Sequence, residues 1–136
     1  MSNSIELFIV TFLWTYIYLA LLAIIGLAIY GIVFRPNILK KIIALTILGD
    51  TANIFMIYVG YRYAYPLKPP ILWSWEPTPE DISTFLAQSV DPLPQALVIT
   101  AIVINLAVTL LICFIAVQAY RLYHSLDVKD LAKLKG

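Results

Sequence analysis

Three long stretches of apolar residues dominate the chain, at about 7–34, 40–63 and 92–121. Each is at least as long as the roughly 20 residues that a helix needs to cross hydrocarbon about 30 Å thick. Because lipid offers no partners to backbone amides, and three crossings cannot close a barrel, each stretch must be a helix. The pattern predicts an all-α integral membrane protein with three transmembrane helices in a single membrane domain, 1–136.

Composition agrees with this prediction. Hydrophobic residues make up 62% of the chain and charged residues 12%, about half the charged fraction of a typical soluble protein. The first stretch lacks a basic leader and is too long for a cleaved signal peptide, so we expect it to be retained. A net charge of +1 gives no reason to expect nucleic acid as a partner. Without a phosphate loop, nucleophile motif or paired metal ligands in the sequence, we expect no catalytic site, cofactor or metal.

The long loop at 64–91 carries two kinds of local signal. Prolines dominate its first half, and each fixes its own φ and biases the preceding residue away from helix. Next, Thr78, Pro79 and Asp81 are typical of a helix cap, a first-turn proline and a first-turn acid. We therefore expect a short amphipathic helix at about 79–89, lying against the membrane surface or a partner. The prolines of the loop are Pro66, Pro69, Pro70, Pro77 and Pro79.

Charged residues are distributed unevenly around the three stretches. Basic residues concentrate in the turn between the first two stretches and in the tail after the third, whereas the long loop and the amino terminus are mainly acidic. This asymmetry predicts a multi-pass protein of the cell membrane, with the amino terminus outside and the carboxyl terminus cytoplasmic. Aromatic residues at the same borders indicate anchoring at the membrane interface. The basic residues are Arg35, Lys40, Lys41, Arg121, Lys129, Lys133 and Lys135, against Arg62 and Lys68 in the long loop; the acidic residues are Glu6, Glu76, Glu80, Asp81 and Asp91; the aromatic residues are Tyr61, Tyr63, Tyr65, Trp73, Trp75, Tyr120 and Tyr123.

Polar residues inside the apolar stretches form two stripes. In the second stretch, Thr46, Asp50 and Asn53 follow one another at i, i+4 and i+7, which places them on one face of a helix. The third stretch repeats small and polar side chains at every fourth position, a spacing that lets another helix approach closely. We expect the two stripes to face each other or a shared partner. The repeat consists of Ala101, Asn105, Thr109 and Cys113.

Asp50 lies near the middle of the second stretch, where a carboxylate costs several kcal/mol unless it is protonated, paired or hydrated. It has two interpretations. In the structural one, it is protonated, or hydrogen-bonded to Asn53, Thr46 or Asn105, and locks helices together. In the functional one, it exchanges protons along a hydrated path that also uses Thr46, Asn53, Asn105 and Thr109. The sequence leaves both open.

The segment at 91–104, DPLPQALVITAIVI, resembles the signature of the C-type small subunit of Mrp multisubunit sodium/proton antiporters. The basic turn at 35–43 resembles the turn between that family's first two helices. The family is similar in turn to the K subunit of respiratory complex I and to the matching subunit of archaeal membrane-bound hydrogenase and sulfur-reductase complexes. Asp91 and Pro92 are also typical of the cap and the first turn of a helix, here the third membrane-length one. The signature residues are Asp91, Pro92, Leu93, Pro94, Gln95 and Thr100.

This resemblance implies a non-catalytic membrane subunit of a sodium/proton antiporter complex, contributing to a proton or cation path and to assembly. Its implied partners are other membrane subunits, the lipid bilayer, protons and sodium ions. Two alternatives stay open, namely the equivalent membrane-arm subunit of a proton-pumping hydrogenase or sulfur-reductase complex, with any redox activity in other subunits, and a purely structural scaffold.

The sequence departs from the complex I protein at two positions. That protein has a glutamate in each of its last two helices. Here Thr46 stands where the first would fall, with Asp50 one turn further on, and the second falls near Thr100 or Ala101. The departure weakens the case for a proton relay through this chain alone, while a path shared with neighbouring subunits stays possible.

Overall fold

The computed structural model describes residues 2–61 and 68–133. This part of the chain contains five helices, of which three are long and apolar enough to cross a membrane. The prediction of an all-α chain with three membrane-length helices is therefore confirmed. Predictions that concern Arg62, Tyr63, Tyr65, Pro66 and Lys135 lie outside the described residues. The helices are α1 (Ser2–Phe34), α2 (Ile38–Gly60), α3 (Pro79–Gln88), α4 (Leu93–Tyr123) and α5 (Val128–Ala132).

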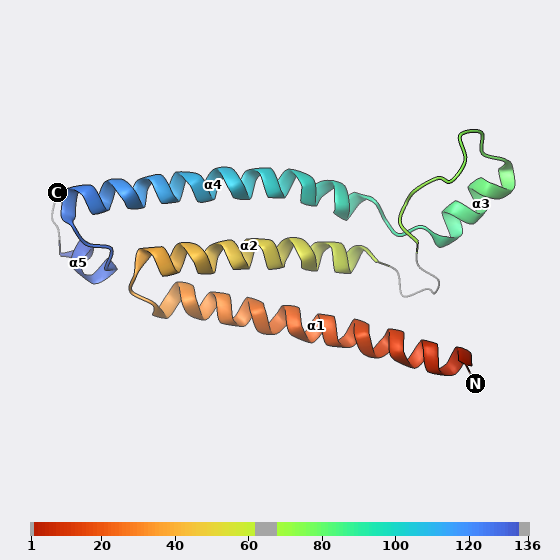
Figure 1. The fold of residues 1–136 in the computed structure, drawn as a ribbon, viewed down its shortest axis with the longest axis horizontal. Helices are drawn as coiled ribbons and strands as arrows, with labels where there is room; N and C mark the ends of the chain where they lie inside the picture. Colours follow the sequence, from red (N-terminus) through yellow and green to blue (C-terminus); the bar gives the residue numbers. More distant parts are fainter. Residues whose placement is uncertain (1, 62–67, 134–136) are drawn as a thin grey trace.

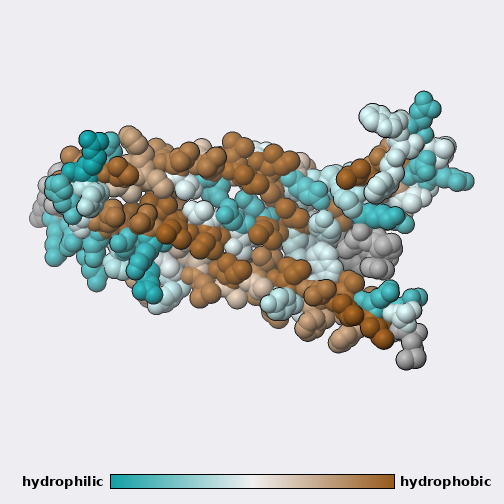
Figure 2. All heavy atoms as spheres, in the orientation of Figure 1, coloured by the Kyte–Doolittle hydropathy of each residue, from teal (hydrophilic) through white to brown (hydrophobic). Residues whose placement is uncertain are grey.

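The three long helices run side by side, with α2 between α1 and α4 (Figure 1). The short helix α3 lies beyond one end of this row and α5 lies at the other, so we refer to the α3 end and the α5 end of the molecule. On the face that Figure 2 shows, apolar side chains cover much of the row, and hydrophilic ones gather at the two ends. This distribution matches an apolar belt in hydrocarbon between two aqueous borders.

The turn between α1 and α2 is closed by side chains at both helix ends. The Asn37 side-chain oxygen accepts hydrogen bonds from the backbone amides of Leu39 at 2.8 Å and Lys40 at 3.4 Å, at the start of α2. The Lys41 ammonium group donates to the backbone carbonyl of Ile32 in the last turn of α1. Both contacts satisfy backbone groups that have no partner within their own helix.

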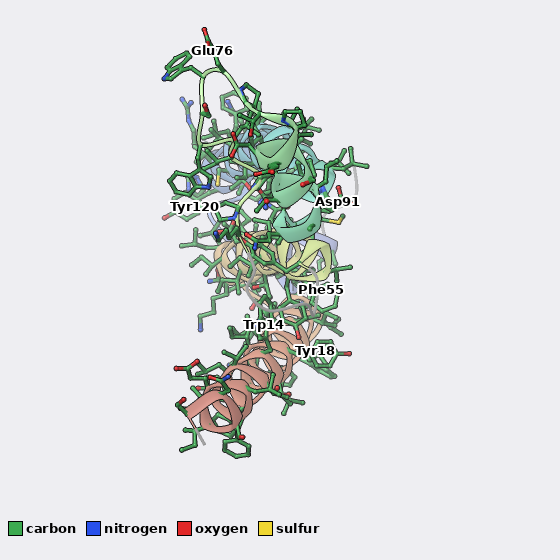
Figure 3. All side chains as sticks on the ribbon, turned by 90° about the vertical axis from the view of Figure 1, so that its right-hand side faces the viewer. Trp14, Tyr18, Phe55, Glu76, Asp91 and Tyr120 are labelled. Atoms are coloured by element: carbon green, nitrogen blue, oxygen red, sulfur yellow. The ribbon has the colours of Figure 1, made fainter. Side chains whose placement is uncertain are left out.

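Aromatic rings fill the α1–α2 interface near the α3 end. Ring centroids of Trp14 lie 5.1 Å from Tyr58 and 5.7 Å from Tyr61, and Tyr18 lies 6.1 Å from Phe55. Figure 3 shows Trp14, Tyr18 and Phe55 grouped between the two helices. The Tyr58 hydroxyl also donates to the Trp14 carbonyl at 3.2 Å. The Tyr61 ring, expected only as an interface anchor, is thus also a contact between helices.

Glycines let α2 approach its neighbours closely. A Cβ at Gly31 of α1 would lie 3.0 Å from the Ala44 Cβ of α2. A Cβ at Gly60 would lie 2.7 Å from Cγ of Pro94, in the first turn of α4. Helix pairs in lipid depend on such close packing, because water does not drive apolar helices together there.

The tail after α4 is joined to the α1–α2 turn by backbone hydrogen bonds. The Ile38 amide donates to the Leu126 carbonyl at 2.9 Å, and the Val128 amide donates to the Pro36 carbonyl at 2.8 Å. This antiparallel pairing holds the basic turn and the basic tail together at the α5 end (Figure 1). The short helix α5, which the apolar pattern does not predict, begins after Asp127, whose side chain caps it.

At the opposite end, a second backbone pairing closes the loop that carries α3. The Lys68 amide donates to the Gln88 carbonyl and the Val90 amide donates to the Lys68 carbonyl, each at 3.2 Å. Val90, which takes part in this pairing, is only 1% exposed. The strand-like contact fixes where α3 ends relative to the start of the loop.

Helix α3 starts with a reciprocal cap. The Thr78 hydroxyl accepts from the Asp81 amide at 3.3 Å, and the Asp81 carboxylate accepts from the Thr78 amide at 3.0 Å. Hydrogen bonds from the Thr78 backbone amide and hydroxyl hold the pKa of the Asp81 carboxyl below its ordinary value. The helix spans Pro79–Gln88, against an expected 79–89.

The start of α4 differs from the sequence prediction by one position. The sequence predicts Asp91 and Pro92 as cap and first turn, but Pro92 occupies the cap position and the helix begins at Leu93. The Asp91 carboxylate instead accepts a hydrogen bond from the Leu93 amide at 3.0 Å. Asp91 is the residue before the cap position. A side chain two residues before an amide reaches it easily, which is why Asp91 can satisfy the helix start from there.

We predict that Gly60→Ala weakens the packing of α2 against α4. The added methyl group would collide with the rigid Pro94 ring, and such overpacking typically costs about 1–3 kcal/mol. Gly26→Ala is the matched control, because a Cβ at Gly26 meets nothing within 4 Å and alanine favours a helix by about 1 kcal/mol. Thermal unfolding of the purified protein in detergent should show a lower midpoint for Gly60→Ala and an unchanged or higher one for Gly26→Ala. Equal midpoints for the two variants would show that the α2–α4 contact is not tight at this point.

Candidate functional site

A carboxylate and an amide meet between α2 and α4, near the middle of both helices. The side-chain nitrogen of Asn105 donates to Oδ1 of Asp50 at 3.4 Å. This distance is longer than the about 2.7–3.2 Å of a typical N–H···O bond, so the contact is weak by itself. Asn105 is half-buried, whereas Asp50 is exposed at the edge of the helix pair. Among the three partners that the sequence suggested for Asp50, the structure brings Asn105 to it.

Gly49 provides the space in which Asn105 lies. A Cβ at Gly49 would be 2.5 Å from the Asn105 side-chain nitrogen and 2.9 Å from its oxygen. The amide therefore rests directly on the α2 backbone, beside Asp50. A glycine immediately before an intramembrane aspartate is a sequence signal for this approach, but it does not reveal which helix makes it.

The other candidate residues extend this pair into a column along the helices. Since α2 and α4 run in opposite directions, Thr46 and Thr109 each lie one turn from the pair toward the α5 end. Asn53 lies one turn from it toward the α3 end. All three are half-buried. The Thr46 hydroxyl donates to the Ile42 carbonyl of its own helix at 3.0 Å, so its hydroxyl proton is not directed at Asp50.

Hydrophilic atoms interrupt the apolar belt where α2 and α4 meet (Figure 2). In a lipid bilayer such a patch is costly unless another polar group, water or a partner subunit covers it. Asp50 has the exposed carboxylate of this region, and its contact with Asn105 uses one of its two oxygens. The arrangement can accept a hydrogen bond or a cation from outside the chain, and it can hold a proton.

The signature residues shape the start of α4. Asp91 bonds the first helical amide, Pro94 packs on Gly60, and Gln95 is half-buried next to it. Thr100, one of the two positions at which the sequence comparison above expects the second glutamate, is exposed, whereas Ala101 is half-buried. In this chain, the described contacts of Asp91 and Pro94 are structural ones.

Sequence reasoning missed two features of the helix interfaces. Thr51 is 5% exposed and its hydroxyl donates to the Ile47 carbonyl at 2.7 Å. The ring cluster between α1 and α2 was also missed, although the i, i+4 spacing of Trp14 and Tyr18 indicates a shared face. Periodicity alone does not tell whether such a face meets lipid or another helix.

Comparison with known families assigns the chain. Residues 15–136 match the family described as NADH-ubiquinone/plastoquinone oxidoreductase chain 4L. The chain belongs to this family. Together with the relatives described next, this match confirms the resemblance that the signature and the basic turn indicated.

Individual relatives come from bacteria and archaea. The chain is 32% identical to the C-type Na(+)/H(+) antiporter subunit of Bacillus subtilis over 123 residues, covering 88% of this chain and 94% of the relative. It is 33% identical to the C1-type Na(+)/H(+) antiporter subunit of Staphylococcus saprophyticus over 105 residues, covering 77% and 78%. An uncharacterised protein of Methanocaldococcus jannaschii is 38% identical over 107 residues, covering 78% and 76%.

A solved structure shows the same fold. One chain of the membrane-bound sulfane sulfur reductase, an archaeal respiratory membrane complex, superposes with a TM-score of 0.68 at 31% identity. The match covers 83% of this chain and 94% of that one. The protein is thus a multi-pass membrane protein of a family whose members are subunits of antiporters and related membrane complexes.

Proposed function

We propose that this chain is a non-catalytic small membrane subunit of a multisubunit sodium/proton antiporter complex, where it contributes to a proton or cation path and to assembly. The antiporter relatives support the first part, because the similarity extends over nearly all of the Bacillus subtilis protein. The position of Asp50 carries the second part, because α2 holds its carboxylate in the middle of the apolar belt, where the Asn105 amide lies 3.4 Å from it.

The position of Asp50 favours a path shared with a neighbouring subunit. Its carboxylate is exposed at the edge of the α2–α4 pair, so another subunit or a file of water can reach it. The half-buried Thr46, Asn53 and Thr109 lie one turn to either side, where they can line such a path. The Asn105 amide then orients the carboxylate and offsets part of the cost of keeping it in the membrane.

The charge distribution supports an orientation for this protein. At the α5 end, the described basic residues outnumber the acidic ones, and at the α3 end the balance is reversed. We infer that the α5 end faces the cytoplasm and that the amino terminus lies outside, in the cell membrane. The described basic residues at the α5 end are Arg35, Lys40, Lys41, Arg121, Lys129 and Lys133, against Asp127 and Asp130; the α3 end has Glu6, Glu76, Glu80, Asp81 and Asp91, against Lys68.

Cysteine labelling tests this orientation. Ser74 and Lys129 are exposed at opposite ends of the molecule, so each accepts a cysteine without disturbing the helix contacts. In intact cells, a membrane-impermeant maleimide should label Ser74→Cys and leave Lys129→Cys unlabelled until the cells are opened. The opposite pattern would invert the orientation. Native Cys113 lies within α4, and the unsubstituted chain measures its background labelling.

Substitution of Asp50 separates ion transfer from helix packing. Asp50→Asn keeps the size and most hydrogen bonds but removes the titrating group, so we expect an assembled complex whose coupled sodium/proton exchange falls about tenfold or more. Asp50→Leu leaves the Asn105 amide without its acceptor, which costs about 1–3 kcal/mol of stability. We therefore expect this variant also to lower the yield of assembled complex. Transport in inverted vesicles and recovery of the complex in mild detergent measure the two effects.

Thr51→Ser is a suitable control for the Asp50 series. It neighbours Asp50 and keeps the hydroxyl that bonds the Ile47 carbonyl, so it should assemble and transport like the unchanged protein. If Asp50→Asn also does so, the carboxylate is structural and the protein acts as a scaffold.

A second candidate function is the equivalent subunit of a proton-pumping hydrogenase or sulfur-reductase complex. The superposition on a chain of the archaeal sulfane sulfur reductase favours it. Metal analysis of the complex purified in mild detergent separates the candidates. We expect no stoichiometric nickel, iron or acid-labile sulfide in an antiporter, whereas their presence would favour the redox complex.

A further inference from the structure

An apolar groove of about 300 Å³ runs between α1 and α2 near the α5 end. Its floor consists of Ala28 and Ala44, which are only 4% and 8% exposed. The helices approach closely there, because Gly31 of α1 faces Ala44. Larger apolar side chains, which are exposed toward the surroundings, form the two walls of the groove. These are Ile24 and Leu27 of α1 and Ile43 and Ile47 of α2.

Lys40 is the charged residue that lines this groove. It is exposed in the first turn of α2, at the border between the basic turn and the apolar run. Within residues 2–61 and 68–133, the Lys40 ammonium group has no hydrogen bond or ion pair. The ammonium group of the neighbouring Lys41, by contrast, donates to the Ile32 carbonyl. A cation without a partner in the described chain therefore lies at the border end of the groove.

The groove leads from Lys40 into the apolar belt. Ile43 and Ile47 follow Lys40 by about one and two helical turns, on the same face of α2. With a rise of about 1.5 Å per residue, the groove reaches roughly 10 Å along the helix. A phospholipid has its groups in the same order, with a phosphate at the membrane border and hydrocarbon directed inward.

We propose that this groove binds one acyl chain of an anionic phospholipid whose phosphate group pairs with Lys40. The lysine selects for negative charge, because basic pockets between membrane helices on the cytoplasmic side bind anionic headgroups. The orientation proposed above places the groove in the cytoplasmic leaflet. The lipid site goes beyond the proposed function and applies equally to an antiporter and to a redox complex.

The size of the groove favours a lipid chain over a helix of another subunit. A helix with its side chains is about 10–12 Å across, so a 10 Å length of it has roughly twice the volume of the groove or more. A helix would also have to bring an acidic side chain to the level of Lys40. A phospholipid supplies the negative charge at that level without further requirements.

Photo-crosslinking in the whole complex identifies what lies in the groove. Benzoylphenylalanine replaces Leu27, a wall residue that is 70% exposed and therefore tolerates the probe. The complex is reconstituted in vesicles with equal amounts of dioleoyl phosphatidylglycerol and dioleoyl phosphatidylcholine. We expect phosphatidylglycerol adducts on this chain to exceed phosphatidylcholine adducts about fivefold, the preference that one lysine near an anionic surface supplies. Equal adducts, a product with another subunit or a second copy, or no product would each overturn the proposal.

The attachment point tests the insertion of the acyl chain. Leu27 lies two turns before Phe34, the last residue of α1, and thus roughly 10 Å inside the border. Fragmentation of the adduct in the mass spectrometer should place the new bond on the acyl chain. Attachment to the headgroup would show that the lipid does not enter the groove.

Substitution of Lys40 tests the headgroup contact. In the chain with the probe at position 27, Lys40→Gln should bring the two lipid adducts to about equal amounts. The change should not destabilise α2, since a cation in the first turn opposes the helix dipole. Lys129→Gln is the matched control, because Lys129 is exposed at the same end and does not line the groove. It should keep the fivefold excess.

Two outcomes of this series would contradict the headgroup contact. An excess of phosphatidylglycerol that survives Lys40→Gln would show that another group selects the lipid. An equal loss in Lys40→Gln and Lys129→Gln would show that the overall charge of this end selects it. Neither result depends on ion transport, so the lipid site and the proposed function are tested separately.

Discussion

The structure depends on how closely α2 and α4 approach each other in a solvent that does not push helices together. In lipid, apolar surfaces gain little from association, so packing and polar contacts between helices must supply the stability. Here glycines at positions 49 and 60 remove the side chains that would keep the helices apart. Asn105 then rests on the α2 backbone and reaches Asp50, so the close approach and the polar contact arise at one place.

The surfaces that the chain leaves uncovered follow from this row of helices. At the α5 end, the α1–α2 turn and the tail satisfy each other's backbone groups, as in the bond from Ile38 to Leu126. At the α3 end, α1 runs past its neighbours and the loop with α3 leans to the opposite side of the row (Figures 1 and 3). Along the row, Asp50 lies at an edge of α2, and most of the outer faces of α1 and α4 are apolar and exposed. Most of the apolar surface is thus available to lipid and neighbouring subunits, as expected in a family that works in multisubunit complexes.

The number of membrane helices, their approximate bounds and the family were all accessible from the sequence, because each depends on local order along the chain. Apolar runs longer than the bilayer require spanning helices, and the run from Asp91 to Ile104 is distinctive as a string of residues. The sequence also singled out Asp50 and Asn105, since polar residues in apolar runs stand out.

Only the tertiary structure decided which of these residues meet and which are left at an edge. The sequence offered three partners for Asp50, and the choice of Asn105 depended on how α4 lies against Gly49. The ring cluster around Trp14, the pairing of the tail with the α1–α2 turn and the projection of α1 past α2 also escaped prediction. All of them depend on the position of one helix relative to another, and residue periodicity, which reports only the faces of a single helix, contains no information about that position.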